Sequence, residues 1–229
     1  MKHIEHAVLL IGSAKREGES TSEALGGYLI ARLQTQGVAI TTFAVHRALR
    51  TPARAQELLA AIDACDLLIL AFPLYVDTLP ALMIQALETI AGHRHDAVVT
   101  PAPWLLAIAN CGFPEAAHND VALEICRNFA LATGMRWAGG LALGAGGAIH
   151  GEPVNAHGMT HNVARALDLT ADALLADQPA PPAALALMRT PLMPDRFYTF
   201  MGNLGWHQMA HSNGVWRQLH AQPLAPQDN

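Results

Sequence analysis

Three features are scarce in this chain of 229 residues, and each scarcity argues against a class of protein. Cysteine occurs only at positions 65, 111 and 126, without a CxxC spacing, so reduced thiols in a cytoplasmic protein are the simplest interpretation. The 14 Lys and Arg are outnumbered by 19 Asp and Glu, and the net charge of −5 argues against a nucleic-acid partner. No uninterrupted apolar stretch reaches the ~18–20 residues that span a bilayer, and the apolar run near the N-terminus is too short for a signal peptide.

Apolar residues, in contrast, make up 52% of the chain. At this length they suffice for one domain with a sizeable core plus an extension. Apolar runs alternate with segments of helical spacing. The predicted strands are residues 7–11, 38–43, 67–72, 104–109 and 135–143, and the predicted helices are residues 20–37, 53–64, 80–90, 120–133 and 160–175. This alternation predicts a doubly wound α/β domain with a parallel sheet, whose ligands bind beyond the carboxyl ends of the strands.

The loop after the first predicted strand, GSAKREGESTS over residues 12–22, is typical of an anion site because it joins a buried strand to a helix start. It is not a Walker A loop, since Glu17-Gly18-Glu19 stands where Gly-Lys-Ser/Thr is needed. It is not the dinucleotide motif either, since Ala14 and Glu17 replace glycines. Its hydroxyls and cations suit the terminal phosphate of a mononucleotide such as FMN; the alternative is an ordinary turn with a capping serine and solvated charges.

Two further predicted loops carry residues that suit a flat ligand. FPLYVDTLP, over residues 72–80, is stiffened by two prolines and offers Tyr75 for stacking on a ring. The alternative is a rigid turn that packs on the next helix. Glycines in the last loop, Gly144 and Gly146, allow close backbone approach because glycine lacks a Cβ atom.

The sequence resembles the NAD(P)H-dependent FMN reductase family in three motifs taken in order. GSAKREGESTSEAL resembles the phosphate loop of that family, FPLYVDTLPALM resembles its Pro-x-Tyr loop, and NCGFPEAAHN is similar to the third loop of its flavodoxin-like members. The resemblance covers roughly residues 7–175. One departure is Lys15, where the family more often has arginine, so the charge is kept but the two-pronged hydrogen bonding is lost.

The resemblance implies a flavodoxin-like five-stranded parallel sheet of order 2-1-3-4-5 that binds FMN without a covalent bond. The implied activity is hydride transfer from NAD(P)H to FMN and onward to a small acceptor, such as a quinone, a nitro or azo compound, a metal ion or a free flavin. No catalytic side chain and no metal site are expected. The alternatives are an electron-carrier flavoprotein that works with a protein partner, and a flavin-free α/β protein.

The implied cofactor-binding residues fall into three groups, one in each loop. Carried over by position, Ser13, Lys15, Ser20, Thr21 and Ser22 would hold the phosphate; Pro73, Leu74, Tyr75 and Val76 would line the ring; and Asn110, Cys111, Gly112 and Phe113 would lie near the ribityl chain and ring.

The C-terminal part breaks the α/β rhythm. The proline-rich residues 178–182 predict a linker, which divides the chain into a flavodoxin-like domain of residues 1–176 and a helical extension of residues 177–229. Within the extension we expect a short helix over residues 183–188 and a longer one over residues 196–210, with Asp195 as its N-cap. The longer helix has an apolar face, for which packing on the domain, a dimer contact and a cover over the flavin remain open. A homodimer is expected, because members of the resembled family often dimerise.

Overall fold

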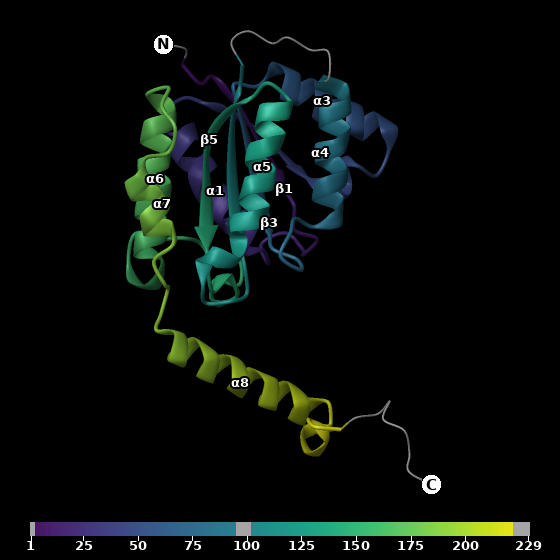
Figure 1. Ribbon diagram of the computed structural model, residues 1–229, viewed down its shortest axis with the longest axis vertical. Coiled ribbons are helices and arrows are strands. Elements are labelled where there is room, and N and C mark those ends of the chain that lie inside the picture. The colour runs from purple at the N-terminus through teal and green to yellow at the C-terminus, as the bar shows by residue number, and fades with distance from the viewer. Residues whose placement is uncertain (1–2, 95–101, 222–229) are drawn as a thin grey trace. The chain divides into compact units, whose positions relative to one another are not determined.

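The chain folds around one five-stranded sheet (Figure 1). The structure, a computed structural model, describes residues 3–94 and 102–221. The strands are β1 (His6–Ile11), β2 (Ala39–Ala44), β3 (Leu67–Pro73), β4 (Trp104–Asn110) and β5 (Arg136–Leu143). All neighbouring strands are parallel and their order is β2-β1-β3-β4-β5, which confirms the predicted sheet.

Helices cover both faces of this sheet. They are α1 (Thr21–Gln34), α2 (Val45–Ala48), α3 (Pro52–Ala64), α4 (Ala81–Arg94), α5 (Asp120–Ala132), α6 (His161–Leu175) and α7 (Pro182–Met188). Alternate residues of β1 serve opposite cores: Leu9 packs with α1 and α6, whereas Leu10 packs with α3, α4 and α5. A strand buried on both faces needs no polar alternation, which is why the strands read as continuous apolar runs.

Short 3₁₀ turns fill several connections, at Ala116–Asn119, Gly146–Ala148, Gly158–Thr160 and Trp216–Gln218.

One short helix was not predicted, and one helix ends later than expected. The single turn α2, directly after β2, was not predicted, because four residues are too few to show a helical period. Helix α4 continues through Gly92 to Arg94. Gly92 does not adopt the left-handed conformation that Gly37 and Gly134 adopt just after the ends of α1 and α5. The side chain of Arg94 is buried and pairs with Asp63 at 3.4 Å, which holds the last turn of α4 on α3.

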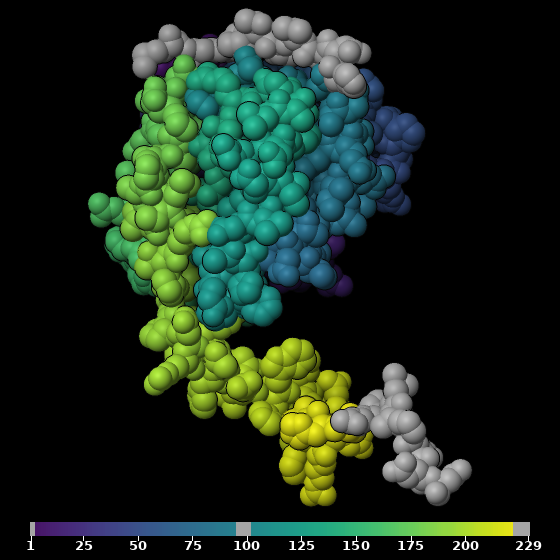
Figure 2. Space-filling model, viewed as in Figure 1, coloured from purple at the N-terminus to yellow at the C-terminus, as the bar shows by residue number. Residues whose placement is uncertain are grey.

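The segment after α6 packs on the sheet. Asp177 accepts from Arg136 at 2.8 Å and from Trp104 Nε1 at 3.1 Å, and the Ala180 N–H donates to the Ala138 carbonyl at 2.7 Å. Figure 2 shows the green atoms of this segment directly against the teal atoms of the sheet domain. The first compact unit therefore runs to Leu192, beyond the expected division after residue 176.

The second compact unit, Met193–Asn229, contains α8 (Asp195–Ser212). The predicted helix is present, but Pro194 occupies the N-cap position and Asp195 is already helical, so Asp195 is not the cap. Large apolar side chains on α8 are each 47–66% exposed: Phe197, Phe200, Met201, Leu204, Trp206 and Met209. Across the described residues, no helix has the length and apolar character to traverse a bilayer.

Candidate functional site

Backbone hydrogen bonds join the ends of β1, β3, β4 and β5 and the loops that follow them. These loops lie together at the carboxyl ends of the strands, which we call this edge of the sheet. The Gly12 N–H donates to the Ala71 carbonyl at 2.8 Å, the Leu74 N–H to the Asn110 carbonyl at 2.8 Å, and the Cys111 N–H to the Leu143 carbonyl at 3.0 Å. The parallel register thus continues past the strand ends. All three predicted motifs therefore lie at one edge, as the strand order requires.

Glycines let these loops touch backbone to backbone. A Cβ atom on Gly144 would lie 2.1 Å from the Pro114 carbonyl oxygen, and one on Gly151 would lie 2.3 Å from the Gly18 carbonyl oxygen. A Cβ atom on Gly146 would lie 2.8 Å from Asn110 Oδ1. The predicted close approach is confirmed at Gly144 and Gly146. The left-handed residue of this loop is Ala145, with φ 54°, rather than a glycine.

Two side chains tie the start of α1 to the other loops. The buried amide of Asn110 donates to the Ser22 hydroxyl at 2.8 Å and to the Phe72 carbonyl at 3.1 Å. The Thr21 hydroxyl donates to the Gly146 carbonyl at 2.8 Å. These bonds hold the first turn of α1 in a fixed position relative to β4 and β5.

Three buried serine hydroxyls at the start of α1 and in the loop before it have no acceptor for their own proton among the described residues. Ser20 is the N-cap of α1 and accepts from the Glu23 N–H at 3.4 Å, Ser13 accepts from the Lys15 N–H at 3.3 Å, and Ser22 accepts from Asn110. Each hydroxyl has one donor proton besides its acceptor positions. The Thr21 proton is used on Gly146, so Thr21 positions the helix start rather than offering a donor. The first N–H groups of α1 add donors, because helix geometry gives them no acceptor within the helix.

Charges of both signs surround this loop. Lys15 is exposed and forms no ion pair within the described part of the chain. The Glu17 carboxylate lies 3.9 Å from Arg47, and the Glu23 carboxylate accepts from the Gly18 N–H at 3.0 Å. The two carboxylates are thus engaged by the loop and by α2. Lys15, which lines the cavity with Ser13 and Ser20, has no carboxylate partner among the described residues.

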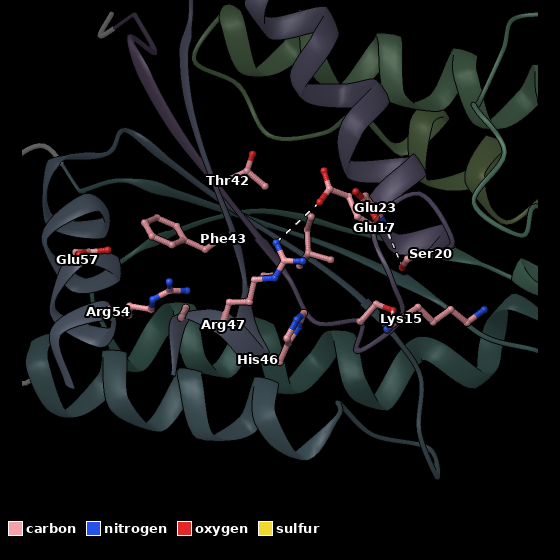
Figure 3. A pocket seen from close by; sticks show the side chains of 14 residues that line it. Lys15, Glu17, Ser20, Glu23, Thr42, Phe43, His46, Arg47, Arg54 and Glu57 are labelled. Atoms are coloured by element: carbon pink, nitrogen blue, oxygen red, sulfur yellow. Dashed lines mark hydrogen bonds and ion pairs between the residues drawn. The ribbon is translucent and has the colours of Figure 1, made fainter. Parts of the chain in front are cut away.

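A cavity of about 480 Å³ opens beside the loop (Figure 3). Three of the predicted residues line it: Ser13, Lys15 and Ser20. Ile11 and the acidic residues Glu17 and Glu23 also line it. The rest of the wall comes from the end of β2, from α2 and from α3, and its larger residues are Thr42, Phe43, His46, Arg47, Arg54 and Glu57. Sequence reasoning did not assign these residues to a site. The α2 turn that carries His46 and Arg47 shows no helical period, and no local pattern marks the end of β2 or the first turns of α3 as the wall of a cavity.

The loop after β3 is a two-residue hairpin. The Tyr75 N–H donates to the Thr78 carbonyl at 2.9 Å and the Thr78 N–H returns the bond at 3.1 Å, with Val76 and Asp77 at φ 49° and 58°. Two left-handed residues make a type I′ turn, which is strained for a β-branched valine. The Leu74 and Tyr75 N–H groups both donate to carbonyl groups of the protein. Val76 is therefore the first residue of this loop whose N–H could donate to a ligand.

Large apolar side chains are exposed on the loops after β3 and β4. Tyr75 is 50% exposed and Val76 is 96% exposed on the loop after β3, and Phe113 is 55% exposed on the loop after β4. Phe113 packs against the His118 ring at a centroid distance of 4.5 Å. Gly112 beside it is exposed, and Pro73 is the last residue of β3. This edge thus combines hydroxyl donors at α1 with apolar, partly open loops at β3 and β4.

The Cys111 thiol has the environment of a packing residue. It is buried, its Sγ lies 3.4 Å from the Phe113 carbonyl, and the Asn119 amide donates to it at 3.4 Å. Burial raises the pKa of the Cys111 thiol, and burial also raises the pKa of Cys65 and Cys126 to about 12. All three cysteines are free.

Alkylation should reflect these raised pKa values. Only the thiolate reacts with iodoacetamide, so at pH 8 the folded protein should be modified more slowly at all three positions than an unstructured cysteine peptide. Modification should speed up as the pH rises toward the thiol pKa. Mass spectrometry of digests reads each site, and the urea-unfolded chain, modified three times, is the control. Rapid modification of Cys111 in the folded protein at pH 8 would contradict the assignment.

No family model matches the sequence, and no curated protein matches it. Solved structures do. An NADH:FMN oxidoreductase superposes with a TM-score of 0.59 at 20% identity, over 83% of this chain and 96% of its own. An NAD(P)H:quinone oxidoreductase from Methanothermobacter marburgensis gives 0.55 at 14% identity, over 71% and 94%. A flavodoxin from Streptococcus pneumoniae gives 0.51 at 13% identity, over 75% and 98%. With the strand order and the loop edge described above, these likenesses show that the chain has the flavodoxin-like fold.

Proposed function

We propose that the chain binds FMN at this edge of the sheet and works as an NAD(P)H-dependent oxidoreductase. The observation that carries the proposal is the set of serine hydroxyl protons at the start of α1. Ser13, Ser20 and Ser22 are buried, each already accepts one hydrogen bond, and each has its proton left to give. A terminal phosphate is an acceptor of several such bonds, and the N-terminus of α1 favours its negative charge.

The remaining residues of the edge fit the rest of FMN. Lys15 supplies a cation for the phosphate, and Thr21 and Asn110 hold the serine-bearing turn in place. Leu74, Tyr75 and Val76, which follow Pro73, lie on one side of the ring position, with Cys111, Gly112 and Phe113 on the other. When bound, FMN supplies the hydride-accepting ring, and the protein supplies orientation and exclusion of water. No side chain is assigned as a catalytic acid, base or nucleophile.

The solved neighbours support the reaction class. One is described as an NADH:FMN oxidoreductase and another as an NAD(P)H:quinone oxidoreductase. The acceptor is then a small molecule, and we propose a quinone, an azo or nitro compound, a metal ion or a free flavin. The three free, buried cysteines favour a reducing compartment, and we propose a cytoplasmic protein; a homodimer stays part of the proposal.

An anaerobic reduction tests the proposal. FMN-loaded protein is mixed with NADH or NADPH, and the long-wavelength flavin absorbance is followed by stopped flow. We expect rapid bleaching by at least one nicotinamide, and the control is free FMN without protein, which bleaches slowly. Protein that binds FMN but stays oxidised with both nicotinamides would instead be an electron carrier that needs a protein partner. A chain that takes up no FMN would be a flavin-free α/β protein.

A further inference from the structure

The cavity beside the phosphate loop does not coincide with the position expected for the flavin ring. In a sheet of order 2-1-3-4-5 a flavin lies at the switch point between β1 and β3. The cavity lies instead at the ends of β1 and β2, and none of residues 73–76 or 110–113 lines it. Its volume of about 480 Å³ lies within the range of small-molecule sites. It offers space for a second molecule that meets FMN only at the phosphate loop.

Cationic side chains gather on the α2 and α3 side of this cavity. Figure 3 shows Arg47 reaching across it toward Glu17, with His46 beside it and Arg54 farther along on α3. The Arg47–Glu17 pair is long, at 3.9 Å, and its side chains are 59% and 79% exposed. Such a pair contributes little and exchanges readily. A phosphate group offers arginine two parallel, charge-assisted hydrogen bonds and would replace Glu17.

His46 is the second α2 side chain at this wall. Its Nδ1 atom has no hydrogen-bond partner among the described residues, but the atom is closed off from solvent and therefore from a ligand in the cavity. Arg47 is thus the α2 side chain that can reach an anionic ligand there.

The wall next to these groups suits a nucleoside. Phe43, at the end of β2, is half-buried and offers a flat face for a base. Glu57 also lines the cavity, and its carboxylate can accept hydrogen bonds from sugar hydroxyls or an amino group. An aromatic face, an acceptor and an arginine are groups that suit a phosphorylated adenosine.

We propose that this cavity binds the adenosine 2′-phosphate end of NADPH, with Arg47 leaving Glu17 to bind the 2′-phosphate. The inference rests on the proposed function and names its hydride donor: NADPH rather than NADH. The pair has a further consequence. Because Glu17 competes with the ligand for Arg47, removing the carboxylate and removing the guanidinium change the affinity in opposite directions.

Calorimetric titration of FMN-saturated protein with adenosine 2′,5′-bisphosphate and with AMP tests the proposal. The bisphosphate should bind about tenfold or more tightly than AMP, the size of one or two charge-assisted bonds. Arg47→Ala should remove that advantage, and Glu17→Gln should tighten bisphosphate binding. Arg50→Ala is the matched control, because Arg50 is an exposed arginine just beyond α2 that does not line the cavity, and it should change nothing.

Three results would overturn the inference: equal affinity for the two nucleotides, no effect of Arg47→Ala, or changes of the same sign in Arg47→Ala and Glu17→Gln. Tighter binding of FAD than of FMN, lost in Arg47→Ala, would also overturn it, since the adenylate of the flavin itself would then fill the cavity. Failure of the proposed function shows separately as a lack of FMN uptake. The bisphosphate titration can then be run on flavin-free protein, where the comparison with Arg47→Ala separates binding at the Arg47 wall from binding at the serine loop.

Discussion

Ser20→Asp is expected to weaken FMN binding by about a hundredfold or more, while the helix it caps stays intact. Aspartate is as good an N-cap as serine, so the start of α1 keeps its bond to the Glu23 N–H. The new carboxylate, however, would replace a hydroxyl that we propose donates to the phosphate. Ser20 is only 3% exposed, so solvent screens the repulsion poorly; two like charges at 4 Å cost about 4 kcal/mol at an intermediate dielectric.

Ser20→Asn is the matched variant, because asparagine has the same size as aspartate, caps equally well and carries no charge. It should bind FMN far more tightly than Ser20→Asp. Fluorescence titration, in which the protein quenches free FMN, gives both affinities, and thermal unfolding shows whether both variants are folded. Equal FMN affinity of folded Ser20→Asp and wild-type protein would place the phosphate elsewhere.

Gly144→Ala should destabilise the protein by about 1–3 kcal/mol, the usual range for a forced contact in a packed region. The added methyl would lie 2.1 Å from the Pro114 carbonyl oxygen and 2.8 Å from the carbonyl carbon. Both are backbone atoms, so neither can turn aside as a flexible side chain would. The loops after β4 and β5 must then separate, and FMN affinity should fall with stability because Asn110 and Cys111 begin the displaced loop.

Urea unfolding followed by circular dichroism measures the loss, and Gly112→Ala is the control. A Cβ atom at Gly112 meets nothing within 4 Å, and its backbone is not left-handed, so alanine fits there. An unchanged urea midpoint in Gly144→Ala would mean that the two loops are farther apart than described.

Most of the sheet could be predicted from the sequence because β1, β3 and β4 are buried on both faces. Runs such as residues 67–72 carry no polar residue, and helical segments separate the strands, with the clearest apolar period in α5 and α6. The strand–loop–helix arrangement after β1, with Ser20 as the N-cap of α1, could be predicted for a related reason: a buried strand, a glycine and a capping serine are local signals.

Other features depend on contacts that no local pattern records. The turn at Val76 and Asp77 contains no glycine and uses a β-branched valine, which rarely adopts left-handed angles, so its sequence did not indicate a hairpin. The Thr21 hydroxyl belonged to the predicted donors, but it donates to Gly146, which is 125 residues away in the sequence. Arg47, the cavity residue on which the nucleotide proposal depends, lies on the single turn α2, which leaves no periodic signal.

Comparing FMN with riboflavin tests the central claim most directly, because the two differ only by the phosphate that the serine hydroxyls are proposed to bind. Purified protein, stripped of any flavin, is titrated with each, and flavin fluorescence is followed to saturation. We expect FMN to bind at one equivalent per chain and riboflavin to bind about a hundredfold or more weakly, in line with the loss of several charge-assisted hydrogen bonds. Equal affinity for the two flavins, or binding of neither, would contradict the account.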